Sequence, residues 1–166
     1  MTSLLLLAAV GLQPGDVVAP FEPLHVSGPF KGVRQCPVCE WSLCPLVFIW
    51  NNGGDPKAVR EIAAAAGELA AGTRTKVLVI DANANAKDKE SEARLTSWSK
   101  EWNLSNVYMM VRCADIKSVL KNYKLQDLKG WKTVVYTATD RKVQKAFVDP
   151  KPTDLGSIKD AISAIR

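Results

Sequence analysis

Three short apolar runs, separated by segments with helical periodicity, constrain the fold of this 166-residue chain more than any other feature. The runs are Leu46–Trp50, Lys76–Ile80 and Val107–Val111. They lack the alternation of polar and apolar residues, which is typical of strands buried on both faces. Strands that alternate with helices predict a parallel sheet, and right-handed crossovers place helices on both of its faces.

The helical segments carry ordinary start and stop signals. Asp55 and Pro56 predict the N-cap and first residue of a helix that follows the first buried run. Gly72 predicts where this helix ends. A second helical pattern places Trp98 and Trp102 on one apolar face. These aromatic residues are expected to belong to the core.

The last third of the chain predicts an antiparallel edge to the sheet. The runs Thr133–Thr137 and Val143–Val148 are joined by the hairpin-sized segment 138–142. Asp115 begins a helix before this hairpin, and Thr153 is expected to cap a final helix after it. A short edge strand is predicted within Pro23–Val26. The fold class is therefore α/β, with a mixed sheet in a single domain over residues 13–166.

Composition excludes several classes of protein. Apolar residues make up 47% of the chain and charged residues 23%, which predicts a folded core and not disorder. The net charge of +5 comes from basic residues mixed with apolar ones, so we expect a solvated basic face and no nucleic-acid partner. Four cysteines are too few for a disulfide scaffold at this length. The oligomeric state is not encoded in any pattern that we find.

The N-terminus contains an apolar run, Leu4–Val10. We interpret residues 1–12 as a short or truncated export signal, although a positive n-region and an A-x-A site are lacking. The alternative is an apolar tail that docks on the domain. The run is too short to span a bilayer, so no integral membrane segment is expected. An export signal predicts a periplasmic or secreted protein, and a docked tail is compatible with a cytoplasmic one.

Several segments in this order resemble the thioredoxin-like superfamily in its peroxiredoxin/TlpA-like branch. Gln13–Phe21 is similar to the family's opening, Leu46–Trp50 to the strand before its active site, and Thr133–Tyr136 with Asp140–Val143 to its late hairpin. The resemblance covers Gly15 to Ile165. It implies a three-layer α/β sandwich with a mixed central sheet, parallel strands and a late antiparallel hairpin.

The chain departs from this family at the positions that matter for catalysis. The family's reactive cysteine follows the first buried strand, and the matching segment Asn51–Pro56 contains no cysteine. The family's cis-proline corresponds to Lys132, which follows Trp131. The resemblance therefore implies that the usual active site is absent, and the fold alone does not establish an activity.

A C-x-x-C pair lies before the first buried strand instead, as Cys36-Pro37-Val38-Cys39. Such a pair beside a βαβ pattern is typical of a redox-active dithiol. The leading hypothesis is thiol–disulfide exchange with protein thiols and disulfides, in which Cys36 attacks and Cys39 resolves the mixed disulfide. Cys44 is a candidate third thiol. This hypothesis requires no cofactor, and whether the chain is an enzyme stays open.

Two alternatives assign the cysteines no catalysis. In the first, the protein is an inactive thioredoxin-fold module for binding or assembly, and its cysteines form a structural disulfide. In the second, the same kind of module holds zinc through Cys36, Cys39 and Cys44 together with His25, the single histidine of the chain.

The position of the pair along the chain predicts where it lies on the sheet. The carboxyl ends of the parallel strands share one end of the sheet, and the cysteine cluster enters Leu46 from the opposite end, unless the preceding loop folds back. Cys113 follows the third run and should lie at the carboxyl end. A disulfide between Cys113 and the cluster is therefore not expected, because bonded cysteines need Cα atoms within about 7 Å.

The loop Asp81–Glu92 matches the ligand spacing of a calcium-binding EF-hand loop through Asp81, Asn83, Asn85 and Glu92. Ala86 stands where that motif needs glycine, and a strand precedes the loop where an EF-hand has a helix. A calcium loop and a plain polar loop both stay open at this point.

Overall fold

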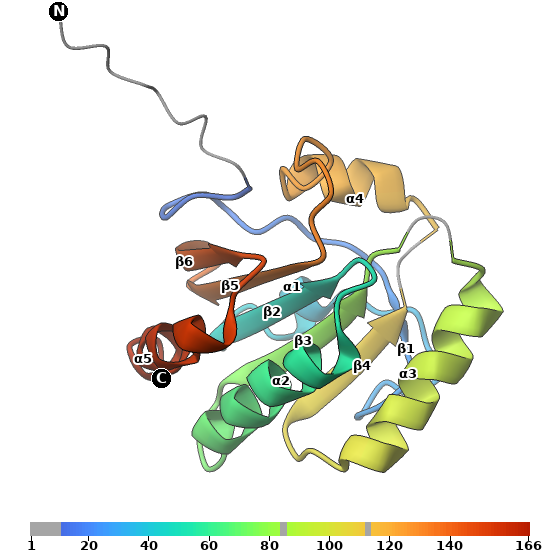
Figure 1. Cartoon of the computed structure of the whole chain (residues 1–166), viewed down its shortest axis with the longest axis horizontal. Helices are drawn as coiled ribbons and strands as arrows, with labels where there is room; N and C mark the ends of the chain where they lie inside the picture. The colour runs from blue at the N-terminus through green and yellow to red at the C-terminus, as the bar shows by residue number, and fades with distance from the viewer. Residues whose placement is uncertain (1–10, 84–85, 112–113) are drawn as a thin grey trace, which may run out of the picture.

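The computed structural model describes residues 11–83, 86–111 and 114–166. It contains a six-stranded sheet with the order β1-β4-β3-β2-β5-β6 (Figure 1). The central strands β2, β3 and β4 are parallel to one another. Towards the edges, β1 runs antiparallel to β4, β5 to β2, and β6 to β5. The predicted mixed α/β sheet is confirmed. The strands are β1 (Leu24–His25), β2 (Leu46–Asn51), β3 (Lys76–Asp81), β4 (Val107–Val111), β5 (Thr133–Thr139) and β6 (Lys142–Val148).

Helices cover both faces of the sheet. One apolar cluster joins one face of the sheet to α2, α3 and α5, and a second joins the other face to α1 and α4. Alternate residues of β2 belong to opposite clusters: Phe48 and Trp50 to the second, Val47 and Ile49 to the first. This is why β2 shows no polar alternation. The helices are α1 (Pro37–Glu40), α2 (Pro56–Ala70), α3 (Asp88–Trp102), α4 (Ile116–Asn122) and α5 (Leu155–Ser163), with a 3₁₀ turn η1 (Pro152–Asp154).

Two predicted boundaries near the C-terminus are wrong. The β5–β6 hairpin is closed by Asp140 and Arg141 alone, with φ values of 50° and 61°. Positive φ at both central residues suits the right-handed twist of a two-residue hairpin, so the strands extend further than predicted. Thr153 does not cap the last helix but lies inside η1, where the Asp154 carboxylate accepts the Lys151 N–H at 2.8 Å.

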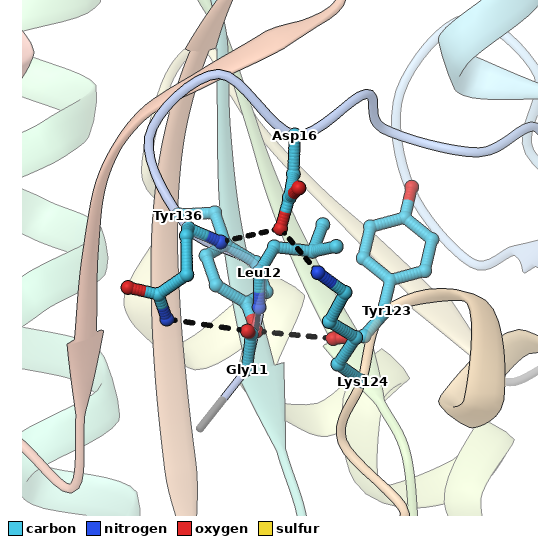
Figure 2. A network of polar contacts seen from close by, with 7 residues as sticks. Gly11, Leu12, Asp16, Tyr123, Lys124 and Tyr136 are labelled. Atoms are coloured by element: carbon cyan, nitrogen blue, oxygen red, sulfur yellow. Dashed lines mark hydrogen bonds and ion pairs between the residues drawn. The ribbon is translucent and has the colours of Figure 1, made fainter. Parts of the chain in front are cut away.

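A polar network fastens the N-terminal segment to the domain. The hydroxyl of Tyr136 on β5 accepts the Leu12 N–H at 3.1 Å and donates to the Tyr123 carbonyl, just after α4, at 3.2 Å. Figure 2 shows this chain of contacts beside an ion pair in which Asp16 accepts from Lys124 at 2.7 Å. Burial raises the pKa of Tyr136 to about 12, so its hydroxyl stays a neutral donor and acceptor at physiological pH.

Leu12 therefore packs in the core, with 2% of its surface exposed. Residues 1–10, which make up most of the predicted export signal, lie outside the described part of the chain. Among the described residues, no helix is both long and apolar enough to cross a membrane.

Candidate functional site

The C-x-x-C pair forms a disulfide on α1. The Cα atoms of Cys36 and Cys39 are 5.3 Å apart, a usual separation for bonded cysteines. Cys36 is the N-cap of α1 and has an extended backbone, and Pro37 is the first helical residue. Proline suits this position because its fixed φ is compatible with a helix and its missing N–H would have no partner there. The helix ends at Glu40 after four residues.

The two cysteines of the disulfide differ in burial. Cys36 is 8% exposed and belongs to the apolar cluster that contains Phe21 and Val38. Cys39 is exposed. The backbone N–H of Cys39 donates to the Cys36 sulfur, with 3.1 Å between nitrogen and sulfur. One sulfur is therefore held in the core, and the other belongs to a residue at the surface.

The loop before α1 folds back along the sheet. The backbone of Arg34 forms an isolated antiparallel β-bridge with Leu24, and Leu24 of β1 pairs with Val111, the last residue of β4. After α1, Trp41 stacks on Tyr108 near the start of β4, with ring centroids 5.0 Å apart. The chain thus reaches α1 from the carboxyl end of β4 and crosses the sheet face towards the start of β2.

This path changes the predicted position of the cysteines. The sequence allowed two paths: an approach to Leu46 from the end opposite the carboxyl ends of the strands, or a preceding loop that folds back. The folded-back loop is observed, and Gly28 and Gly32 make its turns with φ values of 83° each. Cys44 lies just before β2, as expected, and is partly buried without a disulfide. Cys113 lies outside the described residues, and the prediction that it is separate from the cluster loses its basis, because the loop before Cys36 starts from the carboxyl end of β4.

His25 lies beside the residue that precedes Cys36. Its Nε2–H donates to the Gln35 carbonyl at 3.0 Å, which leaves Nδ1 without a partner among the described atoms. Burial lowers the pKa of His25, and the hydrogen bond to Gln35 offsets part of this effect. The neutral ring packs edge-on against Phe30 and Trp41. Sequence reasoning placed His25 near the cysteines but missed Gln35 and Trp41, which no motif marks.

The disulfide form does not provide the four zinc ligands that the sequence suggested. The Cys36 and Cys39 sulfurs are bonded to each other, and the His25 ring donates a hydrogen bond to the Gln35 carbonyl. The described residues contain no group of three or more histidine, cysteine and acidic side chains arranged for a metal ion. Zinc binding by Cys36, Cys39, Cys44 and His25 is therefore a prediction for the reduced protein only.

The bend after β2 is closed by its own polar groups. The side-chain oxygen of Asn51 accepts the Gly54 N–H at 2.8 Å, and the Asn52 amide donates to the Trp131 carbonyl at 3.1 Å. Asp55 caps α2 by accepting the Lys57 N–H. The described backbone, which includes the Trp131–Lys132 bond, contains no cis peptide. This segment offers no sulfur chemistry.

The loop that resembles a calcium site uses its first carboxylate internally. Asp81 is 1% exposed and forms an ion pair with Arg94 of α3. Its other oxygen accepts the Asn83 N–H at 3.1 Å. Asn85 lies outside the described residues, so calcium binding stays a prediction. The Asp81–Arg94 pair was missed because no local pattern links two residues this far apart in the sequence.

The sheet order and the helices on both faces are those of a thioredoxin-like α/β fold, which confirms the fold that the sequence resemblance implied. No protein-family model and no curated protein matches the chain. Solved structures do match it at low sequence identity, and what they share with it is the fold.

Three of these structures illustrate the similarity. Peroxidoxin BcpB from Mycobacterium tuberculosis is 16% identical, with a TM-score of 0.64 over 93% of this chain and 99% of that one. Copper-bound ScoI from Arabidopsis thaliana is 14% identical, with a TM-score of 0.63 over 89% and 96%. The thioredoxin domain of a thiol-disulfide oxidoreductase from Bacteroides vulgatus is 10% identical, with a TM-score of 0.61 over 91% and 99%.

Proposed function

We propose that this protein carries out thiol–disulfide exchange with protein thiols or disulfides through Cys36 and Cys39. The observation that carries the proposal is the closed disulfide on a one-turn helix, with Cys39 exposed to solvent. Exchange requires a thiolate to reach a disulfide sulfur, so an exposed cysteine is a precondition. The similarity to solved redox proteins supports the fold in which such sites occur, and the cysteines of this chain supply the chemistry.

The small size of the ring favours exchange over a purely structural role. A disulfide stabilises a protein mainly by restricting the unfolded chain, and the benefit grows with the length of the closed loop. Closing the four residues from Cys36 to Cys39 contributes about 2 kcal/mol by this relation, against about 3 kcal/mol for a 15-residue loop. The bond also joins residues of the same helical turn. It therefore connects no distant parts of the fold.

The second candidate is a thioredoxin-fold binding or assembly module without catalysis, in which the same disulfide is structural. The burial of Cys36 favours it, because sulfurs packed among apolar groups are usually inert. The absence of cysteine from Asn51–Pro56 also favours it, since the family's usual reactive position carries no sulfur.

We further propose that the protein works in an exported, periplasmic or secreted compartment, with the cytoplasm as the alternative. The disulfide is compatible with such a compartment, where these bonds persist. The apolar run Leu4–Val10 supports it independently as an export signal.

A redox titration with thiol counting tests the proposed exchange. The protein is equilibrated in glutathione and dithiothreitol buffers of known potential, quenched with an alkylating reagent and weighed by mass spectrometry. We expect a two-thiol transition with a midpoint above about −300 mV, as for labile disulfides. The transition should persist in Cys44→Ser and vanish in Cys39→Ser. A midpoint well below that potential would favour the structural module, and stoichiometric zinc in the reduced protein would contradict both candidates.

A further inference from the structure

We infer that Cys39, and not Cys36, is the sulfur that external thiols attack, and that Cys36 is the internal leaving and resolving thiol. This reverses the order expected from the sequence, where Cys36 attacks and Cys39 resolves. The inference rests on the proposed exchange function and assigns the roles within that same site.

Access to the two sulfurs provides the first argument. The rate of exchange depends on which sulfur an incoming thiolate can reach. Cys36 is 8% exposed and shares an apolar cluster with Phe21 and Val38, whereas Cys39 is exposed. Pro37 and Val38, which separate the two cysteines, are both buried. The helix therefore turns its first half into the core and presents Cys39 to solvent.

The leaving group provides the second, independent argument. A disulfide opens faster when the departing sulfur forms the more stable thiolate. The Cys36 sulfur accepts the Cys39 backbone N–H at 3.1 Å, and such a bond favours a charged acceptor. Attack at Cys39 with departure of Cys36 is thus favoured by access, and the hydrogen bond at the Cys36 sulfur offsets part of the cost of a thiolate on this buried residue.

The reaction sequence follows from these roles. In the oxidising direction, a substrate thiolate attacks the Cys39 sulfur, the Cys36–Cys39 bond breaks, and Cys36 leaves as a thiolate. The second thiolate of the substrate dithiol then attacks the substrate sulfur of the mixed disulfide and releases Cys39. Two electrons pass from the substrate dithiol to the protein disulfide. In the reducing direction, Cys39 attacks the substrate disulfide and Cys36 resolves the mixed disulfide by attacking the Cys39 sulfur.

The test uses the full chain with Cys44→Ser and Cys113→Ser, so that only the pair remains. The oxidised protein is exposed to reduced glutathione, quenched with acid and mapped by peptide mass spectrometry. The reduced protein is then treated with limiting iodoacetamide. We expect the glutathione adduct on Cys39 and alkylation of Cys39 at least tenfold faster than of Cys36. The same protein in denaturant is the matched control, in which the two rates should become similar.

The possible results separate this inference from the proposed function. A glutathione adduct on Cys36, or similar alkylation rates in the folded protein, would overturn the assigned roles while leaving exchange itself in place. If no adduct forms at any glutathione ratio and only a stronger reductant opens the bond, the exchange function fails and the assigned roles fail with it. Trapping in single variants gives a second measurement: Cys36→Ser should retain a mixed disulfide with glutathione, and Cys39→Ser should not.

Discussion

Replacing Tyr136 with phenylalanine tests whether the N-terminal segment is an integral part of the fold. The hydroxyl of Tyr136 satisfies the Leu12 N–H and the Tyr123 carbonyl at 3.1 and 3.2 Å, as Figure 2 shows. Leu12 is 2% exposed, so its N–H has little access to water when the hydroxyl is lost. A buried donor left without a partner costs about 2 kcal/mol, and the carbonyl adds about 1 kcal/mol. We therefore expect Tyr136→Phe to lower the free energy of unfolding by about 3 kcal/mol.

Chemical and thermal denaturation measure this loss. For a chain of this size, each kcal/mol corresponds to about 2–4 °C in Tm, so Tm should fall by roughly 6–12 °C. Tyr108→Phe is the matched control, because the Tyr108 hydroxyl makes no hydrogen bond within the described part of the chain and its ring still stacks on Trp41. We expect the control to change stability by less than about 0.5 kcal/mol. Equal, small effects of both variants would refute the idea that Tyr136 anchors Leu12.

Two further predictions concern a helix contact and a buried base. Gly67→Ala should destabilise the protein by about 1–2 kcal/mol in a urea titration, despite the better helix propensity of alanine. The reason is that the new Cβ would lie 3.0 Å from the Ser105 carbonyl oxygen. Gly156→Ala is the control and should be neutral or stabilising, because nothing lies within 4 Å of its new Cβ. Burial lowers the pKa of His25 below its ordinary 6.5. As the pH falls, the unfolded chain therefore binds a proton at His25 before the folded chain does. The contribution of the neutral His25 to the free energy of unfolding is complete above about pH 6.5 and is lost as the pH falls below it. Urea titrations at pH 7.5 and 5.5 should show this loss, and a variant with His25→Gln that kept the full difference would contradict it.

The central strands and the long helices were predictable because each repeats a pattern over many residues. The β2 segment is apolar at every position from Leu46 to Trp50, and both of its faces are covered. The hairpin turn was misplaced because Asp140 and Arg141 adopt positive φ without the glycine that usually signals it.

The arrangement of the site was harder to predict than the fold. A C-x-x-C motif fixes the spacing of two sulfurs but not which of them faces the core. That depends on how residues 27–35 turn back along β1, and an irregular loop has no period to interpret. The motif thus identified Cys36 and Cys39 correctly as a pair that can form a disulfide. Their unequal burial depends on the path of the folded chain, which the motif does not contain.

The unequal burial also bears on how the protein could change redox state without unfolding. Phe21 contacts Trp50 of β2 and Tyr123 in the aromatic core, and Cys36 belongs to the same apolar cluster. This apolar cluster does not depend on the disulfide, so the buried Cys36 should stay within it when the bond opens. Cys39 is held mainly by its own helical turn, which is four residues long and marginal in isolation. Reduction should therefore loosen the exposed end of α1 and leave the sheet unchanged, so that the more mobile of the two cysteines is also the exposed one.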